Sequence, residues 1–167
     1  MKKYDIVGAS VRCYMMFVTR LVEDYSDSVK ITGVYDINKT RCRVFKDKIG
    51  DSCTIYDDFD EMLDKERPDA VIVTTVDSVH HEYIIRALDK GYDVISEKPL
   101  TNTFERCAEI RAAEKRSGRK VTVILYYPAR KRLSRICKRK CLPRCSRRER
   151  LIRPNIPTRS CFRSWLT

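Results

Sequence analysis

The tripeptide Glu97-Lys98-Pro99, directly after a short apolar run at residues 93–96, has the side chains best suited to chemistry. An ammonium group near a carbinol or a carbonyl can orient its oxygen and stabilise the negative charge that develops there. Because a proline restricts the residue before it, the approach of Lys98 is limited. A solvated loop lysine is the alternative, so a catalytic Lys98 depends on the motifs that accompany it.

A turn with one glycine follows the first apolar run, in the sequence Gly8-Ala9-Ser10-Val11-Arg12-Cys13. A dinucleotide fingerprint has glycine at three places, for the tight turn, the approach of the pyrophosphate and the helix packing. Here Ser10 and Cys13 stand at the second and third places, so an ordinary strand–helix turn stays an alternative. Free N–H groups at the helix start still attract anions. We therefore predict that Gly8, Ser10 and Arg12 face a pyrophosphate.

Asp36 ends the second apolar run, where an acid binds the adenosine ribose hydroxyls of a dinucleotide. A carboxylate there disfavours a 2′-phosphate, since like charges about 4 Å apart cost roughly 4 kcal/mol at an effective dielectric of about 20. The sequence therefore favours NAD, although the nearby Lys39 and Arg41 keep NADP possible. The alternative role for Asp36 is a cap for the helix that begins near Asn38.

The segment at residues 74–81 lies after the fourth apolar run, where ligands bind at the carboxyl ends of parallel strands. We expect Thr75 to contact the cofactor through its hydroxyl or its backbone. We expect His80 to lie in the first turn of the next helix and to line the same site. A lone histidine is more often a surface or capping residue, and this is the interpretation for His81.

Short apolar runs alternate with helical patterns up to residue 125. This alternation predicts an α/β fold with a doubly wound, Rossmann-like parallel sheet. The β-branched run at residues 70–73 is typical of a strand buried on both faces. The expected strands are residues 4–7, 29–35, 54–56, 70–73, 93–96 and 121–125, and the expected helices are residues 12–24, 39–49, 58–65, 79–90 and 104–117.

Polar residues and glycines predict where two of these helices begin and end. Asp77 or Ser78 is expected to cap the helix over residues 79–90, with Gly91 just past its end. Thr103 or Asn102 is expected to cap the helix over residues 104–117, with Gly118 as its terminator.

The formal net charge of +12 is confined to the last quarter of the chain. Residues 1–125 contain 21 Lys and Arg against 22 Asp and Glu, whereas residues 126–167 contain 14 against the single acid Glu149. We therefore expect two parts: a globular domain at residues 1–125 and a basic tail, rich in Arg, Cys and Pro, at residues 126–167. A nucleic-acid partner is not indicated for the globular part.

The tail shows no periodicity beyond Pro143, and we expect it to be disordered or an out-of-frame translation of a longer gene. A nucleic-acid-binding arm is the alternative, because fourteen cations could neutralise phosphates. Aromatic residues are not interleaved with them, so stacking on bases is poorly served. No metal site is predicted, because the tail cysteines lack the close pairs of common zinc sites: Cys137, Cys141, Cys145 and Cys161.

The cysteines of the first part indicate a reducing compartment, since they are scattered at small-apolar positions where buried thiols are common: Cys13, Cys42, Cys53 and Cys107. The first residues lack the apolar segment of a signal peptide, and no stretch approaches the roughly 20 apolar residues of a membrane span. We therefore expect a cytoplasmic protein without a membrane partner.

Residues 4–125 resemble the Gfo/Idh/MocA oxidoreductase family, on the Gly8 turn, Asp36, the segment with Thr75 and His80, and above all Glu97-Lys98-Pro99-Leu100. The resemblance implies an NAD(P)-dependent oxidoreductase acting on the CH–OH group of a sugar, polyol or related alcohol. It implies that Lys98 is the catalytic lysine, that His80 belongs to the reacting centre, and that Glu97 and Pro99 belong to the cofactor-binding motif. A family member is also expected to be an oligomer.

The chain departs from the family pattern at Ser10 and Cys13, and at Val76, where the family usually has proline. The family's second domain, which binds substrate and supplies a catalytic Asp/His pair, is not recognisable. We therefore expect a truncated chain that binds NAD weakly and turns over no substrate. A nucleotide-binding or nucleic-acid-binding protein without catalysis is the alternative function.

Overall fold

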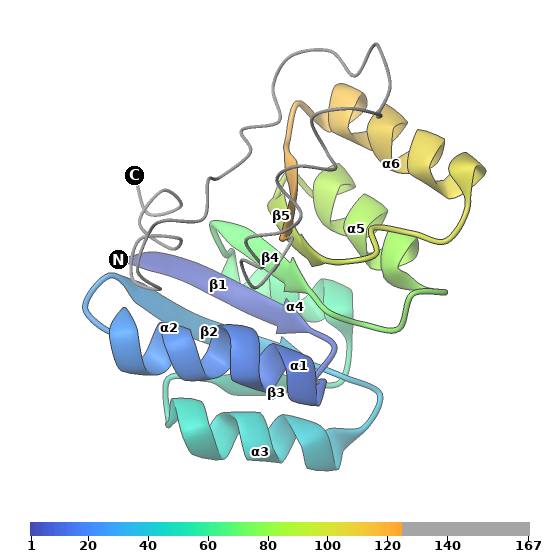
Figure 1. The fold of residues 1–167 in the computed structure, drawn as a ribbon. Helices are drawn as coiled ribbons and strands as arrows, with labels where there is room; N and C mark the ends of the chain where they lie inside the picture. The colour runs from blue at the N-terminus through green and yellow to red at the C-terminus, as the bar shows by residue number, and fades with distance from the viewer. Residues whose placement is uncertain (125–167) are drawn as a thin grey trace, which may run out of the picture. The chain divides into compact units, whose positions relative to one another are not determined.

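The computed structural model describes residues 1–124, and the predicted tail at residues 126–167 lies outside the described residues. Six parallel strands form one sheet in the order β3-β2-β1-β4-β5-β6. Starting from β1, the sheet extends through β2 and β3 on one side and through β4, β5 and β6 on the other (Figure 1). The predicted doubly wound α/β fold is confirmed. The strands are β1 (Lys2–Val7), β2 (Val29–Tyr35), β3 (Thr54–Tyr56), β4 (Ala70–Val73), β5 (Asp93–Glu97) and β6 (Val121–Ile124).

Helices connect the strands and cover the sheet (Figure 1). The first connection is one helical run that contains a π-helical turn, η1, between two α-helical pieces. The helices are α1 (Val11–Cys13), η1 (Tyr14–Val18), α2 (Thr19–Asp24), α3 (Lys39–Ile49), α4 (Phe59–Glu66), α5 (His80–Asp89) and α6 (Phe104–Ser117).

The hydrophobic core under α4, α5 and α6 explains why their apolar residues recur at helical spacing. All four residues of β4 are buried, as its β-branched sequence predicts for a central strand. The helices contribute residues that are at most 2% exposed: Phe59, Met62, Leu63, Ile84, Ala87, Leu88, Ile110 and Ala113.

The predicted caps of α6 are confirmed. The Thr103 side chain accepts a hydrogen bond from the backbone N–H of Arg106, and Gly118 ends the helix with a positive φ of 70°. The predicted cap of α5 is wrong, because Val79 occupies the N-cap position and makes no side-chain hydrogen bond. Asp77 and Ser78 lie too early to reach the first turn of a helix that begins at His80.

The helix predicted over residues 12–24 differs from the structure in its hydrogen bonding. The backbone N–H of Thr19 bonds to the carbonyl of Tyr14, five residues earlier, which widens the turn at η1. The Thr19 hydroxyl donates to the same carbonyl at 3.0 Å. The prediction of buried thiols holds for Cys13, Cys42 and Cys53 but is wrong for Cys107, which is exposed.

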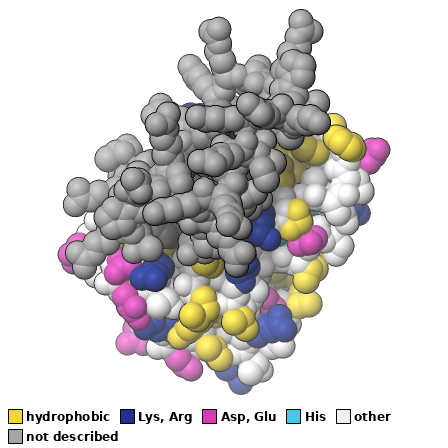
Figure 2. All heavy atoms as spheres, viewed as in Figure 1, with side chains coloured by type: hydrophobic (Ala, Val, Ile, Leu, Met, Phe, Trp, Pro, Cys, Tyr) yellow, Lys and Arg dark blue, Asp and Glu magenta, His cyan; other side chains and the backbone are white. Residues whose placement is uncertain are grey.

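On the face that Figure 2 presents, acidic, basic and apolar side chains are interspersed over the described part of the molecule. This mixture fits the near balance of charges over residues 1–125. None of the helices within the described residues is long and apolar enough to cross a membrane.

Candidate dinucleotide site

The carboxyl ends of β2, β1, β4 and β5 are consecutive along one edge of the sheet. Gly8 follows β1, Asp36 follows β2, Thr75 follows the end of β4, and Lys98 follows β5. The edge includes the point beside β1 where the winding of the sheet reverses, which is where open α/β sheets bind ligands. The fold therefore gathers the predicted site residues from four strands at one edge.

The turn at Gly8 is fixed by backbone contacts that only a glycine permits. Its φ is +93°, and its N–H donates to the carbonyl of Tyr35 at 2.9 Å. A Cβ at this position would lie 2.5 Å from the backbone nitrogen of Thr75. The Thr74 hydroxyl donates to the carbonyl oxygen of Gly8 at 2.5 Å. No pattern in the sequence predicts this role of Thr74, which joins the ends of β1 and β4.

Ser10 begins the helical run that follows the turn. Its Oγ accepts a hydrogen bond from the N–H of Cys13 at 3.1 Å, which makes it the N-cap of α1. Because a serine hydroxyl can donate while it accepts, its proton stays available to an anion. Cys13 is fully buried beneath this turn, and burial raises the pKa of its thiol to about 12. The side chain of Cys13 is therefore part of the packing and stays protonated at neutral pH.

The carboxylate of Asp36 is held by two backbone N–H groups. Oδ2 accepts from Ala9 at 2.6 Å and Oδ1 accepts from Asn38 at 2.7 Å. The side chain of Asn38, and not that of Asp36, caps α3. A carboxylate has about four lone-pair sites, so two acceptor positions remain on Asp36. Its placement beside the Gly8 turn allows it to accept hydrogen bonds from a pair of hydroxyls.

Lys39, one of the two residues that keep NADP possible, is already engaged. Its Nζ donates to the carbonyl oxygen of Tyr56 at 2.6 Å and lies 2.9 Å from a carboxylate oxygen of Asp57. It also lies 5.2 Å from the centre of the Tyr35 ring. These contacts direct the ammonium toward β3 and neutralise its charge.

Thr75 has a hydroxyl oxygen that is buried and has no hydrogen-bond partner among residues 1–124. A buried hydroxyl without a partner is costly, and such groups commonly mark a place where another molecule supplies the bond. The anion-facing helix start, the acidic end of β2 and this free hydroxyl together fit a dinucleotide laid across the edge.

His80 lies in the interior, with only 1% of its surface exposed. Its Nε2 is 3.2 Å from the carbonyl oxygen of Val73, so this nitrogen carries the proton and donates it. Nδ1 is buried and has no partner among the described residues. Burial lowers the pKa of the ring, which keeps it neutral at pH 7. In this position His80 supports the end of β4.

Glu97 and Lys98 differ sharply in exposure. The Glu97 side chain is 4% exposed, and its Oε2 accepts from the backbone N–H of Lys98 at 2.5 Å. Lys98 is exposed, and within residues 1–124 its ammonium has neither a hydrogen-bond partner nor an ion-pair partner. Pro99 follows through a cis peptide bond and is also exposed. Lys98 is thus a cation available to a ligand, anchored by a buried carboxylate.

Arg12 makes a contact that the sequence did not predict. Its Nε donates to Oε1 of Glu97 at 2.5 Å, across 85 residues of chain. The pair connects the glycine turn after β1 with the end of β5. Spacing in the sequence carries no signal for it, because β4 separates the two strands.

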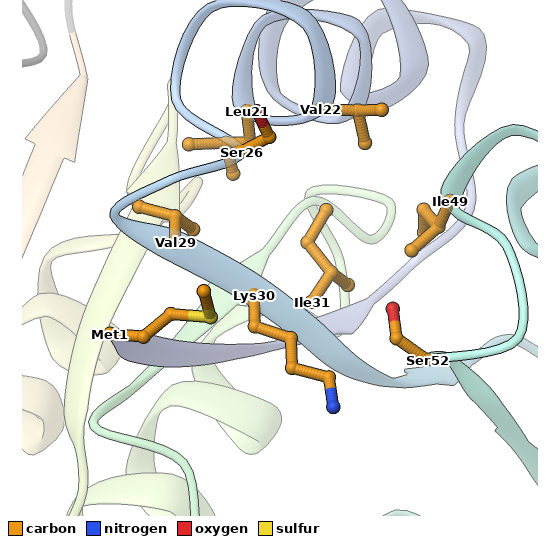
Figure 3. A pocket seen from close by; sticks show the side chains of 9 residues that line it. All are labelled: Met1, Leu21, Val22, Ser26, Val29, Lys30, Ile31, Ile49 and Ser52. Atoms are coloured by element: carbon orange, nitrogen blue, oxygen red, sulfur yellow. The ribbon is translucent and has the colours of Figure 1, made fainter.

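A cavity of about 340 Å³ lies away from these residues (Figure 3). It is bordered by α2, the start of β2 and the end of α3, and its lining is mostly apolar. None of the predicted site residues contributes to it. The lining residues are Met1, Leu21, Val22, Ser26, Val29, Lys30, Ile31, Ile49 and Ser52.

Comparison with known proteins agrees with the geometry of this edge. The family described as an oxidoreductase family with an NAD-binding Rossmann fold (Gfo/Idh/MocA) matches residues 2–125. The Bacillus subtilis protein YteT is 37% identical over 131 residues, which are 76% of this chain and 31% of YteT. Inositol 2-dehydrogenase of Klebsiella pneumoniae is 33% identical over 94 residues, 56% of this chain and 28% of that enzyme.

Two solved structures share the fold at lower identity. The WlbA dehydrogenase from Chromobacterium violaceum, in complex with NADH and UDP-GlcNAcA, has a TM-score of 0.68 and 23% identity, over 74% of this chain and 34% of its own. KijD10, a 3-ketoreductase from Actinomadura kijaniata in complex with NADP, has a TM-score of 0.68 and 19% identity, over 82% and 44%.

The chain spans about a third of the length of the curated relatives that it matches. The family match over residues 2–125 includes the Gly8 turn, Asp36 and Lys98. Residues 2–125 form an NAD-binding Rossmann domain, and the chain belongs to the Gfo/Idh/MocA oxidoreductase family.

Proposed function

We propose that this chain provides the cofactor-binding part of an oxidoreductase that transfers a hydride between NAD and a sugar, polyol or related alcohol. The observation that carries the proposal is the arrangement at one sheet edge of Asp36, the Gly8 turn and Lys98, whose ammonium has no partner within residues 1–124. When bound, the nicotinamide ring supplies or accepts the hydride. We assign residues 1–125 to this domain and residues 126–167 to a separate basic segment.

Each site residue at this sheet edge is assigned to one part of the cofactor or of the substrate. Gly8, Ser10 and Arg12 receive the pyrophosphate, Asp36 accepts hydrogen bonds from the adenosine ribose, and the hydroxyl of Thr75 bonds toward the nicotinamide end. The Lys98 ammonium holds the oxygen of the alcohol or carbonyl and stabilises negative charge on it. Pro99 and Glu97 shape the backbone on either side of Lys98. His80, predicted to line the reacting centre, is buried and bonds to the carbonyl of Val73, two residues before Thr75.

A polyol or sugar is the substrate class that the relatives favour. The Klebsiella enzyme is named for inositol, a cyclic polyol. A single ammonium at the reacting centre suits a neutral substrate whose oxygen becomes negative during the reaction. The alternative function in nucleic-acid binding rests on residues 126–167, which lie outside the described residues.

Asp36→Asn tests the proposal, because it removes the charge while it keeps the shape. We expect the 167-residue chain to bind NADH more tightly than NADPH. In Asp36→Asn the affinity for NADH falls by about tenfold to a hundredfold, since hydrogen bonds to a charged acceptor contribute about 1.5–3 kcal/mol. The affinity for NADPH falls less, because a repulsion with the 2′-phosphate disappears. Dissociation constants from NADH and NADPH fluorescence titrations measure both changes.

Asp69→Asn is the matched control. Asp69 also accepts a backbone N–H, from Lys3 at 2.7 Å, but it lies at the amino ends of the strands. Its substitution leaves both dissociation constants unchanged. If the unaltered chain binds neither dinucleotide below millimolar concentrations, the proposed function is wrong. Equal loss in both variants would remove Asp36 from the ribose site.

A further inference from the structure

The guanidinium of Arg12 has one nitrogen that binds within the chain and two that do not bind any of the described residues. Its Nε is committed to Glu97, whereas its two terminal nitrogens have no hydrogen-bond partner among residues 1–124. The side chain is 46% exposed, although the carboxylate that it binds is 4% exposed. Because a guanidinium is a planar fork with five donors, it can bind a buried carboxylate and an outer anion together. Arg12 therefore binds one carboxylate of the chain and keeps its two terminal nitrogens for an anion from solution.

Each carboxylate oxygen of Glu97 accepts one hydrogen bond. Oε1 accepts from Arg12 and Oε2 accepts from the backbone N–H of Lys98, each at 2.5 Å. Within the described residues Arg12 is the only ion-pair partner of this buried carboxylate. The stability of a buried charge depends strongly on its partner. A change in the charge of the Arg12 guanidinium therefore alters the hydrogen bond that Oε2 of Glu97 accepts from Lys98.

The three residues thus form a continuous path from the glycine turn to the reactive lysine. Arg12 lies two positions after Ser10, the N-cap of the helical run to which the proposed function assigns the pyrophosphate. Glu97 is the last residue of β5, and Lys98 follows it. The path consists of two hydrogen bonds to the Glu97 carboxylate, one from Arg12 and one from the backbone N–H of Lys98.

We propose that Arg12 is a positioning residue that couples an occupied pyrophosphate turn to the backbone at Lys98 through Glu97. This inference rests on the proposed function. A pyrophosphate bound to the terminal nitrogens of Arg12 weakens the attraction between the Arg12 guanidinium and the Glu97 carboxylate. The carboxylate then holds the N–H of Lys98 more strongly, and the lysine is set in place when the cofactor is present.

ADP is a suitable probe, because it carries a pyrophosphate and no nicotinamide, so it cannot contact Lys98 through the ring. The full 167-residue chain, labelled with ¹⁵N only at lysine, is titrated with ADP, and the Lys98 amide resonance is identified by its loss in Lys98→Arg. We expect ADP to shift this resonance in the unaltered chain. The amide shift reports the hydrogen bond to Glu97, which a merely structural role for Arg12 leaves unchanged by ADP.

Two substitutions separate charge from geometry. Arg12→Gln weakens ADP binding about tenfold, as the loss of one charge-assisted contact predicts, and abolishes the shift at saturating ADP. Arg12→Lys keeps a cation and most of the affinity, but a single ammonium lacks the fork, so the shift is also lost. Arg20→Gln is the control, since Arg20 pairs with Asp24 on the same helical run, and it behaves as the unaltered chain.

The outcomes distinguish the two proposals. If ADP binds and leaves the Lys98 amide unmoved in the unaltered chain, the coupling is wrong and the proposed function stands. If Arg12→Lys binds ADP and keeps the full shift, Arg12 is not the connection. If the unaltered chain binds neither ADP nor NADH, the proposed function fails and the coupling fails with it.

Discussion

Gly8→Ala lowers the free energy of unfolding by about 4 kcal/mol, the larger of two strong effects on stability that we expect. A residue other than glycine at positive φ costs about 1–3 kcal/mol, and overpacking adds about 1–3 kcal/mol. Both apply at Gly8, whose φ is +93° and whose Cβ would lie 2.5 Å from the nitrogen of Thr75 and 2.6 Å from the carbonyl carbon of Thr74. Those atoms are backbone of the end of β4 and cannot rotate away.

Gly50→Ala separates the two causes. Gly50 has a φ of +95°, close to that of Gly8, but a Cβ there meets no atom within 4 Å. It therefore reports the cost of the backbone conformation alone. Urea unfolding of the two variants and the unaltered chain gives the comparison, and Gly8→Ala is expected to be at least about 1 kcal/mol the less stable of the two variants. Equal losses would show that the β1 turn and the end of β4 separate to admit a methyl group.

The helices and strands were predictable because local chemistry fixes them. Residues 39–49 and 104–117 are helices with the predicted bounds, since a polar N-cap and a terminal glycine frame each one. Residues 70–73 form the predicted buried strand, because four consecutive apolar residues suit a position inside a parallel sheet. The predicted cap of α5 was wrong. Asp77 and Ser78 are both plausible caps in the sequence, and only the path of the chain after β4 places Val79 at the N-cap position.

The site was predictable as a set of strand ends, and its internal contacts were not. The carboxyl ends of parallel strands share one edge, so Gly8, Asp36, Thr75 and Lys98 could be brought together from sequence. Which groups bond there depends on the order of the strands and on side-chain length. The roles of these residues toward a ligand stay predictions.

Two kinds of polar contact escaped prediction for this reason. The bond from Thr74 to Gly8 exists because β4 lies beside β1. The Arg12–Glu97 pair crosses β4, a distance that a long arginine can span. Neither Thr74 nor Arg12 carries a local signal for its contact, since threonines after strands and arginines in first helical turns are common in proteins.

Asp5 shows the same limit inside the sheet. It lies on β1 at a register shift against β2 and is fully buried. Oδ1 accepts from the Thr32 hydroxyl at 2.7 Å, whereas Oδ2 has no partner among the described residues. Burial is the main cause that raises the pKa of this carboxyl, to about 7, and the nearby Glu66 adds to it, while Thr32, Gly33 and Lys3 oppose it. At neutral pH the folded chain therefore carries a carboxyl that is partly protonated in its core.

The sign of the effect on stability follows from the two protonation states. Below about pH 3, Asp5 is largely protonated in both the folded and the unfolded chain. Between about pH 4 and pH 7 the unfolded chain releases the proton while the folded chain keeps it, so the contribution of Asp5 to stability falls as the pH rises. Above about pH 7 the folded carboxyl also ionises, and the full cost remains. A shift of about three pKa units corresponds to roughly 4 kcal/mol.

Asp5→Asn removes that cost, because the amide has the shape of the protonated carboxyl and does not ionise. We expect the variant to match the unaltered chain near pH 3 and to be more stable by about 2–4 kcal/mol at pH 8. Urea unfolding at intervals between the two pH values measures the difference. Asp47→Asn, at an exposed position of α3, keeps a constant difference over the same range. A constant difference for Asp5→Asn as well would mean that Asp5 is ionised in the folded core, with its charge stabilised by Thr32, Gly33 and Lys3.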